Sequence, residues 1–339
     1  MNKHIFSIIV PVYNAEKTLE RTLASFISNK EYIQEVILVN DGTTDNTFND
    51  DVCNISLFNQ FYNIKIIDNQ YKKGAGLARK TGILNSKAKW ITFVDADDCL
   101  TPNSLCYVYD KIINDSKKAV LLHTKTIYYE YGNFNSKSIK FSDNSCGGNF
   151  YKRDYLIKNN LYPHDDLFMV EDEYFNEKID KFIQYCDLFK HDIIYFDYPV
   201  YEVHHDYVFG LSFALRNWAD YCCKYHLLFK EYLVCDFIKN KKIYNVLLNE
   251  YMDNFIFCYF LSQGLMMDDD VDFNLQLYKK YFKRALDFFK NTFNKTDEYL
   301  TNYFYRNKDN ASALMQGAFL SIGFEFNISI NFDVFVRTI

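Results

Sequence analysis

The chain has 339 residues, of which 49% are hydrophobic and 19% aromatic, including 32 Phe and 29 Tyr. This composition is globular and excludes a mainly disordered chain, and the length suffices for one large domain with an addition or for two modest domains. The formal net charge of −6 disfavours nucleic acid as a main partner, because the chain as a whole does not attract a polyanion.

The first hundred residues alternate between predicted strands and predicted helices. Apolar, β-branched runs predict strands at residues 5–10, 36–39, 64–67 and 90–94. Helices are expected after Asn14, acting as an N-cap, from Thr47 onward, and over residues 76–86. This alternation predicts an α/β fold whose parallel sheet is covered by helices on both faces.

Polar side chains follow the predicted strands of this sheet. In open α/β sheets the ligand binds beyond the carboxyl ends of the strands. The residues at those positions are Tyr13, Asp41, Asp68 and Asp95. They are therefore the first candidates for binding residues.

The later part of the chain is less regular. Residues 119–201 predict short mixed elements around a turn at Gly147 and Gly148. After Gly210 an aromatic-rich pattern with helical period predicts a helical C-terminal extension. No repeat or low-complexity segment interrupts the sequence.

Nine cysteines are scattered without a C-x-x-C pair or the spacing of a metal site, as is typical of reduced, mostly buried thiols in the cytosol. The N-terminal apolar run ends at Pro11, too early for a signal peptide. No apolar run reaches the roughly 18 residues of a membrane span. We expect a cytoplasmic protein that is soluble or peripheral to the membrane.

The segment WITFVDADDCLTP places Asp95, Asp97 and Asp98 directly after a buried strand. Carboxylates clustered there are costly through desolvation and mutual repulsion, and a divalent cation would relieve that cost. Mn²⁺ or Mg²⁺ is held by one or two carboxylates together with phosphate oxygens, and would neutralise charge on a departing nucleotide diphosphate. The triplet alone is weak evidence among 44 acidic residues, but its position after a strand favours a metal site.

The turn VILVNDGTTDNT allows two interpretations of Asp41. It is either part of a βα turn with a helix cap, or an acceptor for a base N–H or a ribose hydroxyl. The residues alone leave both open.

In KKGAGLARKTGI, Gly74 and Gly76 begin a helix whose amide groups could face a phosphate. A Rossmann fingerprint is excluded, because Arg79 stands where its third glycine would be. The basic residues near this helix start are Lys72, Lys73, Arg79 and Lys80.

These segments, together with SIIVPVYNAEKTL and in this order, resemble the family 2 glycosyltransferases of GT-A fold over residues 5–105. The resemblance implies inverting transfer from a nucleoside diphosphate sugar, commonly a uridine one, with Asp97 as a metal ligand and Asp95 in the donor or metal shell. Lys80 replaces the Asn that often follows the family's Arg. The implied contacts to the nucleotide sugar are Pro11, Tyr13, Asp41, Asp68, Gly74, Arg79, Asp95 and Ala96.

The segment CGGNFYKRDYLIKNNLYPHDDLFMVEDEYFNEKI resembles the family's acceptor-side block. Inverting transfer needs a carboxylate on the face opposite the leaving diphosphate to take the acceptor's proton. The resemblance makes Asp172 that base, with Glu171 and Asp166 in reserve. Spacing alone would favour an exposed acidic helix start.

In VYEVHHDYVFGLS, His204 and His205 are candidates to ligate Mn²⁺ or to donate to a phosphate oxygen. A structural role for the pair is equally compatible with the residues. The predicted metal ligands are therefore Asp97, Asp95 and His204.

By this interpretation residues 1–110 bind the nucleotide sugar, 111–210 bind the acceptor and 211–339 form the helical extension. YKKYFKRALDFFKNTF in the extension is basic and amphipathic. It could contact an anionic membrane near a lipid-linked acceptor, although an ordinary surface helix is favoured. Self-association through the extension is also open.

The predicted protein is a metal-dependent glycosyltransferase acting on a glycan or lipid-linked acceptor, in synthesis of a bacterial capsule, lipooligosaccharide or other surface polysaccharide. A nucleotidyltransferase is disfavoured, because PVYN stands where its Gly-rich, Arg-containing loop would be. The remaining alternative is a non-catalytic nucleotide-sugar binder or scaffold.

Overall fold

The computed structural model describes residues 3–69, 74–115, 118–130, 133–141, 145–164, 167, 170–187 and 190–204, and scattered residues between 224 and 251. The chain divides into two compact units. One comprises Met1–Ala214 and Cys235–Phe237, and the other comprises Leu215–Val234 and Ile238–Ile339. All the helices and strands with assigned bounds belong to the first unit.

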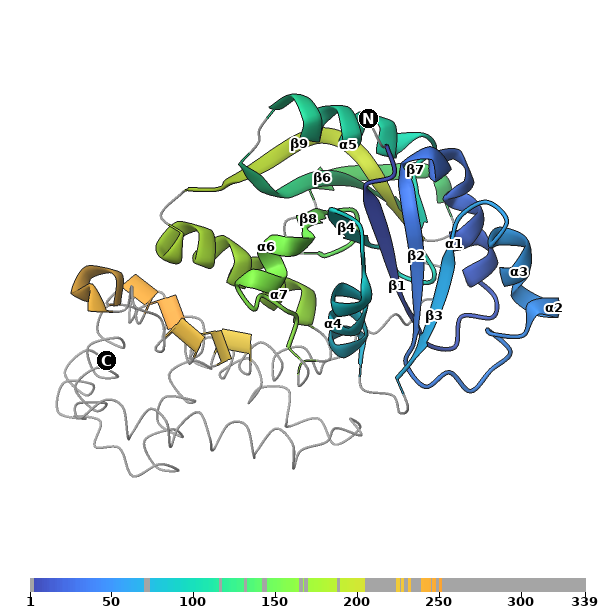
Figure 1. Ribbon diagram of the computed structural model, residues 1–339, viewed down its shortest axis with the longest axis horizontal. Helices are drawn as coiled ribbons and strands as arrows, with labels where there is room; N and C mark the ends of the chain where they lie inside the picture. Colours follow the sequence, from blue (N-terminus) through green and yellow to red (C-terminus); the bar gives the residue numbers. More distant parts are fainter. Residues whose placement is uncertain are drawn as a thin grey trace, which may run out of the picture. The chain divides into compact units, whose positions relative to one another are not determined.

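Four parallel strands form the N-terminal half of the sheet in the order β3-β2-β1-β4 (Figure 1). They are β1 (Phe6–Val12), β2 (Ile33–Asn40), β3 (Ile64–Asp68) and β4 (Trp90–Phe93). In this register Ile9 pairs with Ile37 on one side and with Phe93 on the other. The predicted parallel α/β core is confirmed, with each strand within a few residues of its expected bounds.

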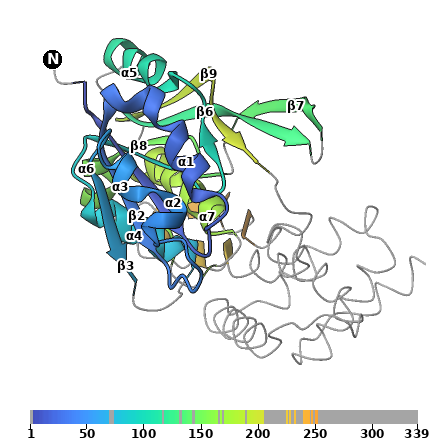
Figure 2. The same cartoon turned by 90° about the vertical axis from the view of Figure 1, so that its right-hand side faces the viewer.

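The sheet continues through antiparallel and mixed pairs. β4 pairs with β8, and the order then runs β8-β6-β9-β5, with β7 paired to β6 (Figure 2). These strands are β5 (Cys99–Leu100), β6 (Ala119–Glu130), β7 (Asn133–Phe141), β8 (Phe150–Lys152) and β9 (Asp192–Val203). The expectation of only short elements over residues 119–201 was wrong, because β6 and β9 each have 12 residues. Both strands have several polar residues between their apolar ones, so no apolar run in the sequence marks their full length.

Helices pack on both faces of the sheet (Figure 1). Side chains alternate along β1, so Ile8 and Val10 join one core and Ile9 joins the other. On the first face lie α1 (Leu19–Ser25) and α5 (Ser104–Asp115). On the second face lie α4 (Ala75–Asn85), α6 (Arg153–Lys158) and α7 (Glu171–Lys181). A 3₁₀ helix, η1 (Ile27–Tyr32), follows α1, and a π-helical turn, η2 (Phe182–Cys186), follows α7.

Two predicted helix starts were wrong. Asn14 is not an N-cap: it has a positive φ of 50°, its side chain accepts a hydrogen bond from the Thr44 N–H at 2.8 Å, and α1 begins only at Leu19. The stretch after Thr47 is not one helix but two short ones, α2 (Asp50–Cys53) and α3 (Ile55–Phe58). They are separated by Asn54, whose left-handed φ of 50° interrupts the helical path.

Among the described residues, five cysteines form no disulfide bond: Cys53, Cys99, Cys106, Cys146 and Cys186. Within the same residues, no helix combines the length and apolar character needed to cross a bilayer. The predicted basic amphipathic helix, with Lys279, Lys280, Lys283, Arg284 and Lys290, lies outside the described residues.

Candidate active site

The residues Asp95, Ala96, Asp97 and Asp98 form a tight turn after β4, here called the carboxylate turn. The Asp98 N–H closes it by donating to the Asp95 carbonyl at 3.1 Å. From α1, the Thr22 hydroxyl donates to the Ala96 carbonyl at 2.9 Å and the Arg21 guanidinium donates to the Asp97 carbonyl at 2.6 Å. With its backbone held in this way, the turn leaves the Asp97 side chain exposed.

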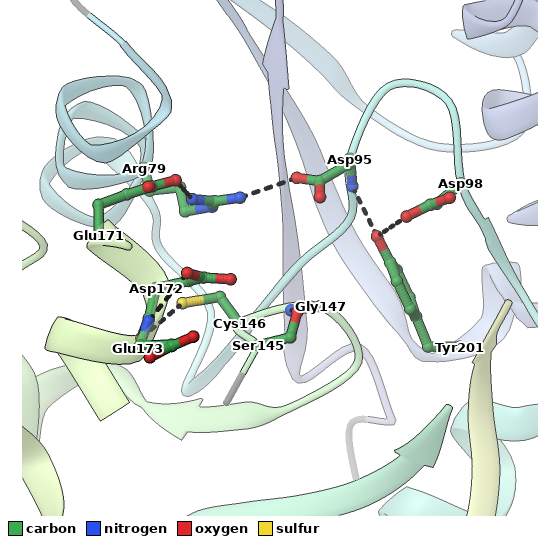
Figure 3. Close-up of polar contacts among 10 residues, drawn as sticks. All are labelled: Arg79, Asp95, Asp98, Ser145, Cys146, Gly147, Glu171, Asp172, Glu173 and Tyr201. Atoms are coloured by element: carbon green, nitrogen blue, oxygen red, sulfur yellow. Dashed lines mark hydrogen bonds and ion pairs between the residues drawn. The ribbon is translucent and has the colours of Figure 1, made fainter. Parts of the chain in front are cut away.

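Asp98 points the opposite way, into the protein, and is only 6% exposed. Its carboxylate accepts a hydrogen bond from the Tyr201 hydroxyl at 2.7 Å (Figure 3). It accepts a second one from the His204 N–H at 2.9 Å. Burial raises the pKa of Asp98 well above its usual range, and the charges of Asp97 and Asp95 raise it further, against the lowering effect of the two hydrogen bonds. Of the adjacent acids, Asp97 therefore faces solvent and Asp98 is an internal anchor.

Arg79, on α4, lies between two acidic side chains (Figure 3). One of its guanidinium nitrogens lies 2.5 Å from Glu171 Oε1 and another lies 2.9 Å from Asp95 Oδ1. Burial works against the charged form, but the charges of Asp95 and Glu171 outweigh it and raise the pKa of Arg79 well above its ordinary value. The permanently charged guanidinium thus connects the carboxylate turn to the first residue of α7.

Asp172 is the second residue of α7 and follows the Glu171 that Arg79 holds. It lies deep among protein groups while keeping some solvent contact. Burial and, next, the charge of Glu171 raise the pKa of Asp172 to about 8, whereas Arg79 and the Glu173 N–H, which donates at 2.9 Å, act in the lowering direction. A carboxyl with a pKa near neutrality can exchange a proton at physiological pH.

Glu171 differs from its neighbour. It is buried, its carboxylate binds Arg79, and burial raises its pKa while Arg79 lowers it. The structure therefore makes Asp172 the more available of the two as a proton acceptor. The other reserve base, Asp166, lies outside the described residues.

The other predicted donor contacts lie along the carboxyl ends of the parallel strands. Asp41 is buried after β2 and accepts a hydrogen bond from the Gly74 N–H at 2.9 Å, which fastens the start of α4. Gly74 has a φ of 94°, a conformation that glycine adopts without strain. Asp68 ends β3 and accepts a hydrogen bond from the Asn40 side chain at 2.9 Å.

The first strand brings two further predicted contacts to the same edge. Pro11, within β1, pairs with Val39, and Tyr13, just beyond the strand, is 41% exposed. Of the predicted basic residues, Lys80 lies on α4, whereas Lys72 and Lys73 are outside the described part of the chain.

The described residues contain no group of three or more His, Cys, Asp or Glu side chains placed to hold a metal ion. Asp97 is exposed and the Asp95 side chain is 42% exposed, so both offer hard oxygen ligands of the kind that Mn²⁺ and Mg²⁺ take together with phosphate oxygens. These two residues fit a diphosphate-bound cation.

The structure does not gather the predicted ligand His204 with Asp95 and Asp97. The Nε2 atom of His204 lies 3.5 Å from the Glu202 carboxylate, and its ring packs against Tyr129 with centroids 5.3 Å apart. Its backbone N–H, not its ring, contacts the carboxylate turn. His205 lies outside the described residues.

Two contributors to the site were not predicted from the sequence. Tyr201 was not a candidate, because it contacts residues more than 100 positions away and no local pattern marks it. The Arg79–Glu171 ion pair was also not predicted. The sequence held one signal for it: Arg79 stands among the apolar residues of its helix, and a buried arginine needs an anionic partner.

Residues 7–178 match the family model described as glycosyl transferase family 2, so the chain belongs to that family. This match spans the carboxylate turn, Arg79 and Asp172. The resemblance seen in the sequence is confirmed.

Two curated relatives are similar to about half of this chain. The glycosyltransferase GlyA of Streptococcus pneumoniae is 29% identical over 48% of this chain and 22% of its own length. The Escherichia coli protein WfgD, named as a UDP-Glc:alpha-D-GlcNAc-diphosphoundecaprenol beta-1,3-glucosyltransferase, is 27% identical over 48% of this chain and 56% of its own. The matched part is thus at most just over half of either relative.

A solved structure, S. aureus TarS in complex with UDP-GlcNAc, is similar over 90% of this chain and 88% of that chain, with a TM-score of 0.63 and 20% identity. At this identity the likeness shows the fold. The predicted GT-A fold is confirmed.

Proposed function

We propose that the protein transfers a sugar from a uridine diphosphate sugar to an acceptor hydroxyl with inversion at the anomeric carbon. The observation that carries this proposal is the Arg79 bridge. It joins the carboxylate turn, at the nucleotide-binding edge of the sheet, to Glu171 and thereby to Asp172, the neighbour whose pKa is raised to about 8. A donor-binding element and a proton acceptor of suitable pKa therefore lie in one network.

Asp172 is the proposed general base. In an inverting displacement the acceptor oxygen attacks from the face opposite the leaving diphosphate, and it must lose its proton as the new bond forms. The deprotonated Asp172 takes that proton. Glu171 holds Arg79 and is not itself the base, because its carboxylate is already engaged.

The carboxylate turn and its neighbours are the proposed donor site. Asp97, with Asp95, would hold Mn²⁺ or Mg²⁺. When bound, the ion would supply positive charge against the negative charge that develops on the departing diphosphate. Around the nucleotide we place Pro11, Tyr13, Asp41, Asp68, Gly74 and Ala96.

The uridine donor is supported by the name of WfgD, which specifies UDP-Glc, and by the UDP-GlcNAc bound to TarS. The proposed acceptor is a glycan or lipid-linked saccharide of a bacterial surface polysaccharide, in keeping with the undecaprenol-linked acceptor in the name of WfgD. Action at the inner face of the cytoplasmic membrane is part of the same proposal.

The test is release of UDP from UDP-Glc, UDP-Gal and UDP-GlcNAc, each with Mn²⁺, first with water and then with saccharide acceptors. Replacing the base, Asp172→Asn, should lower the rate about 100-fold or more while UDP affinity is retained. Asp154→Asn is the matched control, because Asp154 is also the second residue of a helix but its side chain is 87% exposed.

Equal rates for wild type and Asp172→Asn would refute the assignment of the base. UDP binding without turnover of any donor or acceptor would instead favour the non-catalytic nucleotide-sugar binder.

A further inference from the structure

Tyr201 lies on β9 and is only 1% exposed, yet its hydroxyl makes two polar contacts with one short turn. It accepts a hydrogen bond from the Asp95 N–H at 3.0 Å and donates one to Asp98 Oδ2 at 2.7 Å (Figure 3). Since the Asp98 N–H also donates to the Asp95 carbonyl, the phenol closes the carboxylate turn a second time from inside the protein.

The two ends of the turn are therefore fixed by one hydroxyl group. On its other side, Thr22 and Arg21 of α1 hold the carbonyls of Ala96 and Asp97. The acid between the two anchored ends is Asp97, and its side chain is exposed. The contacts of the turn thus keep Asp98 buried while Asp97 faces solvent.

The space for the Tyr201 ring is provided by two adjacent glycines. A Cβ added at Gly147 would lie 2.7 Å from Cε1 and Cζ of Tyr201, and one added at Gly148 would lie 2.6 Å from its Cβ. Gly148 also has a φ of +73°, which disfavours any other residue. The Gly-Gly pair is thus explained by close approach to Tyr201 as well as by the turn that it forms.

We propose that Tyr201 is a positioning residue, which holds the carboxylate turn in the conformation that binds the donor diphosphate. This inference rests on the proposed function, because it assigns the turn to the donor. Tyr201 does not touch the donor itself: it acts through Asp95 and Asp98. Residues that orient ligating side chains affect affinity by about 10-fold to 100-fold when they are altered.

The test compares Tyr201→Phe with Tyr62→Phe in the full-length protein. Each substitution keeps a buried ring and removes one hydroxyl; the Tyr62 hydroxyl donates to the Leu23 carbonyl at 2.6 Å, outside the carboxylate turn. The dissociation constant of UDP is measured calorimetrically with Mn²⁺, and the melting temperature is measured in parallel.

Tyr201→Phe should bind UDP at least about 10-fold more weakly than wild type. Tyr62→Phe should bind UDP with wild-type affinity, even if its melting temperature falls as much as that of Tyr201→Phe. Wild-type affinity in Tyr201→Phe would overturn the inference and leave Tyr201 a structural contact only. Failure of the wild type to bind any nucleotide would instead contradict the proposed function, so the two failures are distinguishable.

A second variant approaches the same contact from its other end. Asp98→Asn keeps the shape of the side chain but replaces an acceptor oxygen by a donor nitrogen, and it too should weaken UDP binding. If both substitutions act through one contact, the variant that combines Tyr201→Phe with Asp98→Asn should bind UDP no more weakly than whichever single variant binds UDP less tightly. Additive losses would overturn the inference, as would failure of both single variants to fold.

Discussion

Asp172 and Glu171 are neighbours on α7, yet their surroundings give them different roles. Glu171 is bound to a charged arginine, whereas Asp172 has a pKa raised to about 8 by burial and by Glu171. The reactivity of a carboxyl is thus set by what surrounds it, and the sequence motif alone does not distinguish the two acids.

The proposed base predicts a pH dependence of turnover. Only the deprotonated Asp172 accepts a proton, so kcat/KM should rise with pH, about tenfold per unit at low pH, and level off above about pH 8. UDP release measured from pH 6 to pH 9 checks this. A rate that stays flat across that range would rule Asp172 out as the titrating base.

The same pKa shift predicts a pH dependence of stability. A carboxyl whose folded pKa is raised contributes stability that is fully present below its unfolded pKa, near 4, and is lost as the pH rises through about 8. The asparagine side chain of the Asp172→Asn variant does not titrate. The stability of the variant relative to wild type should therefore increase from about pH 4 to about pH 8 and stay constant above that pH. Urea unfolding at several pH values measures the difference, and a constant difference would contradict the shift.

Arg79 gives a further prediction at the scale of one residue. Lysine offers one compact ammonium in place of a planar fork, so Arg79→Lys cannot hold Asp95 and Glu171 together in the same way. UDP-sugar turnover should fall about 10-fold or more. Arg153→Lys, at a more exposed ion pair with Asp154, is the control and should leave turnover unchanged. Equal turnover in Arg79→Lys and Arg153→Lys would show that the ion pairs of Arg79 with Asp95 and Glu171 do not contribute to turnover.

Among the elements, α4 connects the carboxylate turn to the start of α7. It packs so closely on β1 that a Cβ added at Gly82 would lie 2.2 Å from Ile9 Cγ2. Arg79, one turn earlier on α4, depends on this placement to reach both of its acidic partners.

Gly82→Ala should therefore destabilise the fold, even though alanine favours helix. Overpacking costs about 1–3 kcal/mol and exceeds the gain of up to about 1 kcal/mol in helix propensity. Thermal unfolding measures the change, with Leu84→Ala on the exposed side of α4 as the control. An unchanged melting temperature would mean that α4 does not pack against β1 as described.

The predictability of an element depends on how local its signal is. Strands β1 to β4 were predictable because mostly apolar, often β-branched residues form them, and α4 because its start is marked by glycine. The non-helical conformation of Asn14 was not predictable, since its side chain accepts a hydrogen bond from a distant partner, Thr44. The inward turn of Asp98 likewise depends on Tyr201, which only the fold brings near.

For the whole molecule, the family match covers residues 7–178 and the proposed donor site lies within it. The residues of the proposed site come from six separate segments: the carboxyl ends of β1, β2, β3 and β4, the first half of α4 with Gly74 before it, and the start of α7. Individually these signals were weak in the sequence. Their order along the chain supported the family, and the fold connects them.

The central claim is that the carboxylate turn binds a nucleoside diphosphate together with a divalent cation. Calorimetric titration of the purified chain with UDP, GDP, dTDP and CDP, each with Mn²⁺ and again after EDTA treatment, tests it most directly. If the turn binds both, UDP should bind selectively, the binding should require the cation, and it should be lost in Asp97→Asn. Absence of binding to all four nucleotides, or UDP binding that is unchanged by EDTA and by Asp97→Asn, would contradict it.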